Sequence, residues 1–128
     1  MVNQTFVNLA VKDLPRSMTF FSKLGFTFEP KFTNEKAAGM VVAENSFVML
    51  LAEDFFQTFT DRALCDPTRQ TEVLICLSCS SRSEVDEFVR KALEAGGNAP
   101  RPVQDIESMY GHGFEDLDGH IWELVYMP

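Results

Sequence analysis

One order of elements, a strand followed by a helix and three further strands, occurs twice along this chain. The first copy begins with TFVNLAV, residues 5–11, whose alternation of polar and apolar residues is typical of a half-buried strand. The helix that follows has a capping residue at Asp13, and Gly25 ends it. The remaining strands of this copy are expected over residues 26–32, 37–43 and 46–52.

The second copy shows the same order of elements. Its first strand is VLICLSC, residues 73–79, and its helix begins at Ser81, with Glu84 placed to complete a capping box. Strands are expected around residues 102–104, 109–115 and 120–126. Leu9 of the first copy falls on Leu77 of the second, and Val11 falls on Cys79 at the same spacing.

This repeat predicts an α+β fold in which tandem βαβββ units form curved, mixed sheets around a concave cup, with the helices outside. We expect a single domain over residues 1–128, with unit one at about 4–53, a linker at about 54–70 and unit two at about 71–128. A chain of this length buries enough apolar surface to fold without disulfide bonds or a structural metal ion.

The charge of the chain excludes two classes of partner. With 11 basic and 19 acidic residues, the formal net charge is −8. An acidic chain repels phosphate backbones and anionic lipids, so we expect neither a nucleic-acid partner nor a membrane partner. The N-terminus has no basic region followed by a long apolar run, and a cytoplasmic protein is expected.

Three cysteines, Cys65, Cys76 and Cys79, are expected to be free thiols, because the number is odd and no secretion signal is seen. Cys76 and Cys79 resemble a metal-binding pair in spacing. On a strand, however, residues three apart point to opposite faces, so the two side chains cannot share one metal ion. We interpret them as small, buried hydrophobic residues.

The chain resembles the vicinal oxygen chelate superfamily, which is also called the glyoxalase/bleomycin resistance/dioxygenase group. The stretch FVNLAVKDLPRSMTFFSKLGF is similar to the first strand and helix of that group, and FEDLDGHIWELV resembles its closing hairpin. The match is closest to bacterial lactoylglutathione lyase-related (glyoxalase-like) proteins. The resemblance implies a homodimer and a cup that holds a small molecule.

In metal-dependent members of this group, the first and last strands of each unit supply four His, Glu or Gln ligands to a divalent ion. The resemblance places Phe6, Met49, Leu74 and Glu123 at these positions. Only Glu123 has a nitrogen or oxygen donor for such an ion. No cofactor is therefore expected, and a divalent metal is disfavoured unless the strand register slips by a residue or two.

Both histidines lie in one stretch, GHGFEDLDGHIWELV, residues 111–125. A two-residue turn at residues 117–118 would place His112 opposite Glu123, while His120 would face the other way and support the turn. Such a couple acts as a general acid/base pair, or anchors a polar group of a ligand, or only satisfies its own hydrogen bonds. Glu123 and His112 are our candidate catalytic residues.

Further residues are expected to contact a ligand because they share strand faces with the positions above. They are Phe6, Asn8, Phe47, Met49, Leu74, Cys76, Ser78, Tyr110 and Ile121.

Three functions agree with this sequence. The first is a metal-independent protein that binds a small, largely apolar molecule in its cup. The second is an enzyme of the lyase, isomerase or dioxygenase kind that uses Glu123 and His112, with or without a divalent metal. The third is a dimeric protein-interaction module whose cup is filled by its own side chains.

Overall fold

The computed structural model describes residues 1–128, and the chain divides into two compact units, residues 1–64 and residues 65–128. Each unit contains one four-stranded sheet with both parallel and antiparallel pairs, and one long helix. The predicted α+β tandem of βαβββ units is confirmed.

The first unit carries its strands in the spatial order β1-β4-β3-β2. β1 runs parallel to β4, and the other pairs are antiparallel. Its elements are β1 (Thr5–Val11), α1 (Leu14–Lys23), β2 (Thr27–Glu29), the 3-10 turn η1 (Pro30–Phe32), β3 (Ala37–Ala43), β4 (Ser46–Ala52), α2 (Glu53–Phe56) and the 3-10 turn η2 (Gln57–Phe59).

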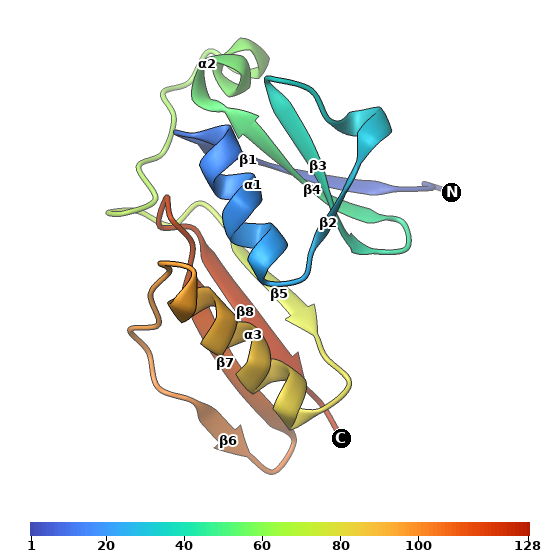
Figure 1. Cartoon of the computed structure of the whole chain (residues 1–128), viewed down its shortest axis with the longest axis vertical. Coiled ribbons are helices and arrows are strands. Elements are labelled where there is room, and N and C mark those ends of the chain that lie inside the picture. Colours follow the sequence, from blue (N-terminus) through green and yellow to red (C-terminus); the bar gives the residue numbers. More distant parts are fainter. The chain divides into compact units, whose positions relative to one another are not determined.

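α1 forms where the sequence predicts it and packs against β3 and β4 (Figure 1). The Asp13 carboxylate accepts a hydrogen bond from the backbone N–H of Arg16, which satisfies one of the free donors at the helix start. Leu14 and Phe21 are buried on the side of the helix that faces the sheet. Gly25, with a φ of 103°, ends the helix in a conformation that glycine adopts at little cost.

The strand predicted over residues 26–32 is shorter than expected. β2 ends at Glu29, and Pro30 begins the 3-10 turn instead. Proline has no N–H to donate to a sheet ladder, so the chain leaves the sheet at this point.

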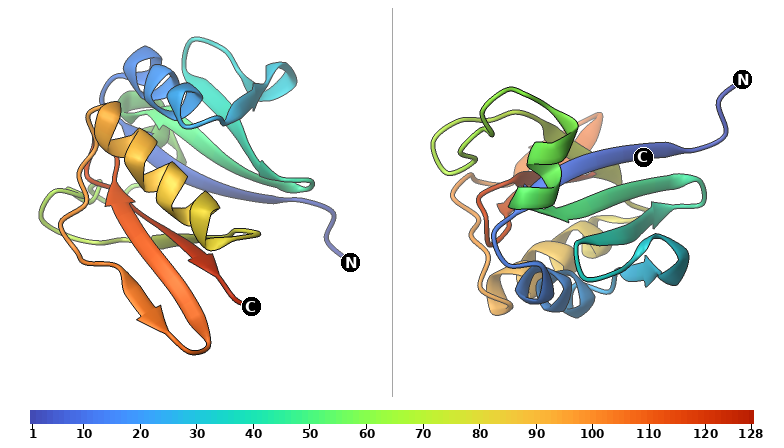
Figure 2. Two further views of the ribbon diagram at one scale, coloured as in Figure 1. Left: turned by 60° about the horizontal axis from the view of Figure 1, so that its bottom comes forward. Right: turned by 90° about the horizontal axis from the view of Figure 1, so that it is seen from above.

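The second unit repeats the arrangement with the order β5-β8-β7-β6. β5 is parallel to β8, and Figure 2 shows β6 as the outer strand next to β7. Its elements are β5 (Leu74–Ser78), α3 (Arg82–Glu94), β6 (Gln104–Ile106), β7 (Met109–Glu115) and β8 (Ile121–Tyr126).

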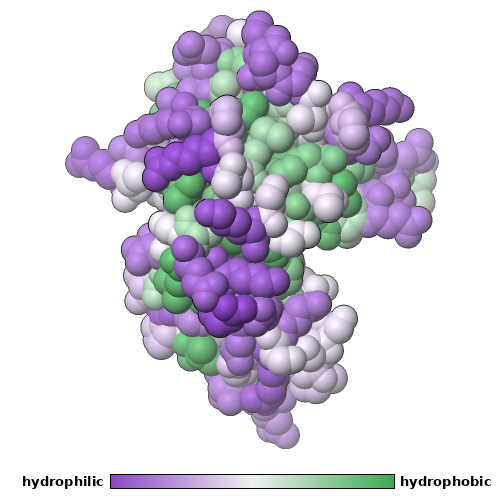
Figure 3. Space-filling model, in the orientation of Figure 1, coloured by the Kyte–Doolittle hydropathy of each residue, from purple (hydrophilic) through white to green (hydrophobic).

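α3 begins at the predicted cap, where the Ser81 hydroxyl accepts a hydrogen bond from the N–H of Glu84. The Glu84 carboxylate bonds the N–H of Ser80 rather than that of Ser81, so the capping box is closed one residue earlier than expected. The helix packs against β7 and β8, and its outward side is hydrophilic, as Figure 3 shows. Exposed ion pairs join Arg90 of this side to Glu87 and Glu94.

None of the helices is long and apolar enough to cross a membrane.

Candidate functional site

The second sheet has two distinct faces, and the strand pairing assigns each side chain to one of them. The Tyr110 hydroxyl donates a hydrogen bond of 2.6 Å to Asp86 on α3, so Tyr110 points to the face that the helix covers. We call this the helix face and its opposite the distal face. Phe114 and Trp122 share the helix face, where their rings stack with centroids 6.2 Å apart. The residues that alternate with these along β7 and β8 point to the distal face.

The predicted pairing of His112 with Glu123 is wrong. In the structure, His112 lies opposite Leu124, and Glu123 lies opposite Gly113. The turn contains one more residue than expected, because Asp116 pairs with His120 and Gly119 adopts a φ of 97°. A shift of one residue moves every side chain of a strand to the other face. His112 therefore belongs to the helix face and Glu123 to the distal face, and a catalytic role for either stays a prediction.

The expectation for Tyr110 fails for the same reason. Its hydroxyl is bound to Asp86, and the guanidinium of Arg82 lies over its ring at 4.9 Å. The hydrogen bond to Asp86 is the main cause of the raised pKa of Tyr110. Tyr110 thus stabilises the docking of α3, and its hydroxyl does not point to the distal face.

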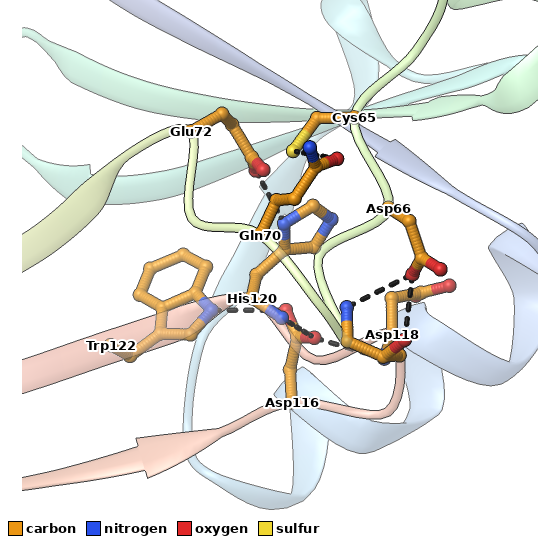
Figure 4. Close-up of polar contacts among 9 residues, drawn as sticks. Cys65, Asp66, Gln70, Glu72, Asp116, Asp118, His120 and Trp122 are labelled. Atoms are coloured by element: carbon orange, nitrogen blue, oxygen red, sulfur yellow. Dashed lines mark hydrogen bonds and ion pairs between the residues drawn. The ribbon is translucent and has the colours of Figure 1, made fainter.

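His120 lies in a buried polar cluster around Asp116 (Figure 4). One oxygen of Asp116 accepts hydrogen bonds from the N–H groups of Asp118 and His120, and the other accepts from Nε1 of Trp122 at 3.0 Å. His120 Nδ1 lies 2.8 Å from a carboxylate oxygen of Glu72. This cluster fixes the hairpin turn and ties Glu72 to it. The structural role predicted for His120 agrees with these contacts.

Burial raises the pKa of Asp116, and its neighbour His120 and the hydrogen bond from Trp122 act in the opposite direction. The carboxylate is thus held at some electrostatic cost, which its donors partly offset.

The segment between Asn98 and β6 leaves the edge of β7. Asn98 exchanges both backbone hydrogen bonds with Glu115, and Gln104 pairs with Gly111, but residues 99–103 make no backbone bond to β7. Pro100 and Pro102 cannot donate such bonds, which explains the gap. It also explains why β6 begins at residue 104 rather than 102.

The side chain of His112 on β7 spans this gap. Its Nε2 lies 3.0 Å from the backbone oxygen of Arg101. This bond fixes the distance between the segment and β7, so we assign His112 a positioning role for residues 99–103.

A cavity of about 280 Å³ lies between this segment and the distal face of β7, β8 and β5. Met109, Ile121 and Val125 provide apolar walls, and Glu123 and Cys76 contribute polar atoms. The volume lies just below the range of roughly 300–1,000 Å³ for small-molecule sites. The cavity suits a compact, largely apolar molecule.

Two glycines of β7 shape the floor of the cavity. A β-carbon at Gly113 would lie 2.9 Å from the backbone oxygen of Trp122, so only glycine allows β8 to approach this closely. The same β-carbon would lie 3.7 Å from Cγ of Glu123, which shows that the stem of Glu123 extends over Gly113. Gly111 is buried beside Met109 and Val125.

The cysteines are free, as expected, but Cys76 is not buried. β5 is an edge strand, and Cys76 lies exposed on the distal face opposite Glu123. Partial desolvation and the nearby carboxylate raise the pKa of the Cys76 thiol. At neutral pH the thiol is thus uncharged and a poor nucleophile.

The corresponding face of the first unit is filled by its own aromatic rings. Phe6 and Phe47 stack with centroids 5.2 Å apart, and Phe32 packs edge-on against both of them. A β-carbon at Gly39 would lie 2.6 Å from Cβ of Phe32, so η1, which carries Phe32, packs directly against β3. The sulfur of Met49 would lie 3.5 Å from the same added β-carbon at Gly39.

The nine residues expected to contact a ligand therefore lie in different surroundings. Two of them, Cys76 and Ile121, line the cavity. Leu74 and Ser78 are exposed on β5, and Tyr110 is on the helix face. The others belong to the first unit, where Asn8 is exposed beside Met49, and Phe6 and Phe47 form the aromatic cluster. Whether any of them binds a ligand stays a prediction.

Several cavity residues were missed in the sequence. They are Pro100, Arg101, Pro102, Gln104, Met109, Gly111 and Gly113. Two signals could have indicated them. Two nearby prolines interrupt a strand ladder, and two glycines at alternate positions remove side chains from one face of β7.

Comparisons with known proteins agree with this architecture. Residues 4–43 match the family described as bleomycin resistance protein-like N-terminal. A hypothetical protein from S. aureus is 32% identical, with a TM-score of 0.83 over 98% of this chain and 94% of that one. A glyoxalase-related enzyme from Fulvimarina pelagi also gives a TM-score of 0.83, at 21% identity, over 100% of this chain and 90% of that one.

A third solved structure, a glyoxalase/bleomycin resistance protein/dioxygenase family enzyme from Burkholderia phytofirmans PsJN, has a TM-score of 0.78 at 15% identity. The match covers 96% of this chain and 97% of that one. The chain therefore has the fold of proteins named for the glyoxalase/bleomycin resistance/dioxygenase family, and its N-terminal part matches the bleomycin resistance protein-like model. A comparison with curated proteins gives no match.

The residues of this chain do not fit the divalent metal centre that its resemblance to the vicinal oxygen chelate superfamily implies. The ring of Phe6 and the alkyl chain of Leu74 have no donor atom, and Met49 has only a soft thioether. In the whole chain, no group of three or more His, Cys, Asp or Glu side chains is placed to hold a metal ion. Glu123 is the one residue of the set with the required chemistry.

Proposed function

We propose that this protein binds a small, largely apolar molecule in the cavity of its second unit, and that it does so without the metal centre of its metal-dependent relatives. The observation that carries the proposal is the cavity itself, with apolar walls and the Glu123 carboxylate on the distal face. A concave site with few polar groups is the usual form of a small-molecule site.

The test is a thermal-shift screen of small molecules against the wild type and a variant with a filled cavity. Gly111→Leu adds bulk on the distal face, where an added β-carbon meets side-chain carbons of Met109 and Val125 at 3.3 Å and the backbone oxygen of Leu124 at 3.5 Å. Compounds that raise the melting temperature of the wild type are expected to lose this effect in the variant.

Two controls separate a filled cavity from a damaged fold. Gly111→Ala adds only the β-carbon and is expected to keep binding with a small loss. Thr71→Leu adds bulk at an exposed position outside the cavity and is expected to bind as the wild type does. If no compound stabilises the wild type, or if Gly111→Leu binds as well as Thr71→Leu, the cavity is not the site.

The metal-free part of the proposal has its own test. Elemental analysis of the purified protein is expected to find no stoichiometric divalent metal. A metal content near one per chain that is lost in Glu123→Ala would contradict it. For the lyase or dioxygenase alternative, His112 and Glu123 do not form the predicted cross-strand pair, because they lie on opposite faces of the sheet, and that alternative stays a prediction.

A further inference from the structure

The Glu123 carboxylate has no partner of its own within the protein. Neither a hydrogen bond nor an ion pair to it is found in the structure, although its side chain is half-buried in the cavity wall. A partly desolvated carboxylate without a donor is unfavourable, and in its metal-dependent relatives a cation would neutralise this position. Here the other three ligand positions cannot hold a metal ion, so no bound cation neutralises the charge of Glu123.

The other ionisable groups that line the cavity do not remove this imbalance. Glu115 adds a second carboxylate, which accepts a long hydrogen bond of 3.4 Å from Asn98. Arg101 is the one permanent cation, but its side chain is exposed and forms no ion pair, so water screens its charge. His112 also lines the cavity, but its ring belongs to the helix face and its Nε2 is bound to the backbone oxygen of Arg101. Cys76 is held in its neutral form beside Glu123. The cavity therefore has two carboxylates against one solvated guanidinium.

We propose that the ligand of this cavity carries a cationic nitrogen, such as an ammonium or amidinium group, on a compact apolar body, and that Glu123 is its counter-ion. This inference rests on the proposed binding function and specifies the class of ligand. The apolar body contacts Met109, Ile121 and Val125, while the cationic nitrogen donates to the Glu123 carboxylate in the cavity wall. A neutral ligand of the same shape would desolvate the carboxylate without replacing its hydrogen bonds, and an anionic one would also be repelled.

The experiment uses three naphthalene derivatives of nearly equal size, 1-naphthylmethylamine, 1-naphthalenemethanol and 1-naphthoate, with affinities measured by isothermal titration calorimetry. A charge-assisted hydrogen bond predicts that the amine binds at least about tenfold more tightly than the alcohol, and that the carboxylate binds least. Glu123→Gln keeps the shape of the side chain and removes its charge. In this variant the amine is expected to bind no more tightly than the alcohol, while the affinity for the alcohol is unchanged or higher.

Glu94→Gln, at an exposed position on α3, is the matched control and should leave all three affinities unchanged. If the wild type binds amine and alcohol equally, or if Glu123→Gln retains the preference for the amine, the inference is overturned while binding in the cavity stands. If none of the three compounds binds and the neutral compounds of the thermal-shift screen also fail, the binding function is overturned together with this inference.

Discussion

Replacing the buried Asp116 by alanine is expected to destabilise the second unit more than the same change at any exposed carboxylate. The Asp116 side chain accepts hydrogen bonds from the N–H groups of Asp118 and His120 and from Nε1 of Trp122. His120 and Trp122 are buried, so water cannot replace the lost acceptor at either N–H without entering the core.

The magnitude follows from these contacts. A buried donor that loses its acceptor costs about 1–3 kcal/mol, so the His120 and Trp122 groups together give about 2–6 kcal/mol. The N–H of Asp118 is only half-buried and adds little. Removal of a carboxylate that burial disfavours returns part of this cost, as the raised pKa of Asp116 indicates. We therefore expect a loss of about 2–4 kcal/mol, or a fall in melting temperature of roughly 10 °C.

The assay is urea denaturation followed by fluorescence, because the chain contains a single tryptophan, Trp122, which is itself one of the donors. Far-UV circular dichroism measures the same transition over the whole chain. The matched control is Asp105→Ala, which removes an exposed ion pair with Arg82 and should cost at most about 1 kcal/mol. If Asp116→Ala is as stable as Asp105→Ala, with an unchanged denaturant slope, the cluster does not stabilise the turn.

Further outcomes are expected from the same structure. The folded-state pKa of Asp116 is raised, so just above pH 3.8 the folded protein binds more protons than the unfolded chain. Acidification from pH 7 should therefore stabilise the wild type relative to Asp116→Asn, as parallel urea titrations would show. An equal pH dependence in both proteins would contradict this. Tyr110→Phe should leave ligand affinity unchanged in calorimetry, since the hydroxyl is on the helix face; a loss of affinity would place it in the cavity instead. Phe32→Ala should cost roughly 2–4 kcal/mol in urea denaturation, against less than about 0.5 kcal/mol for the exposed Phe59→Ala, and equal costs would argue against the aromatic cluster. Light scattering is expected to give the mass of a homodimer, and a monomeric mass would contradict that prediction.

The helices and the strand order could be predicted because local signals and the repeat agree. Asp13, Ser81 and Gly25 mark helix ends through short-range hydrogen bonds and backbone preference, which act alike in most contexts. The repeat then gives the second unit the topology of the first. Where a proline interrupts a strand pattern, at Pro30 and Pro102, the predicted strand was too long or misplaced.

The candidate site was predicted less well because it depends on register. A turn of one more residue reverses the faces of all side chains between Met109 and Glu115 relative to β8. The sequence contained a signal for the longer turn, since Gly119 follows an Asp at the position where a three-residue hairpin loop needs a left-handed residue. The face of Glu123 does not depend on this turn, because Glu123 alternates along β8 with the buried Trp122.

The cavity arises where residues 99–103 make no backbone-to-backbone hydrogen bond to β7, and not where the core lacks side chains. Part of the wall of the proposed binding cavity is therefore encoded in a segment on which the strand ladders of this unit do not depend. Changes in length or composition of that short segment can widen, narrow or recharge the binding space while the hydrogen-bonded strands and the packed helix stay as they are. Chains that share this scaffold can differ in what they bind at little cost to folding, and the segment between Asn98 and Gln104 is the place to look for that divergence.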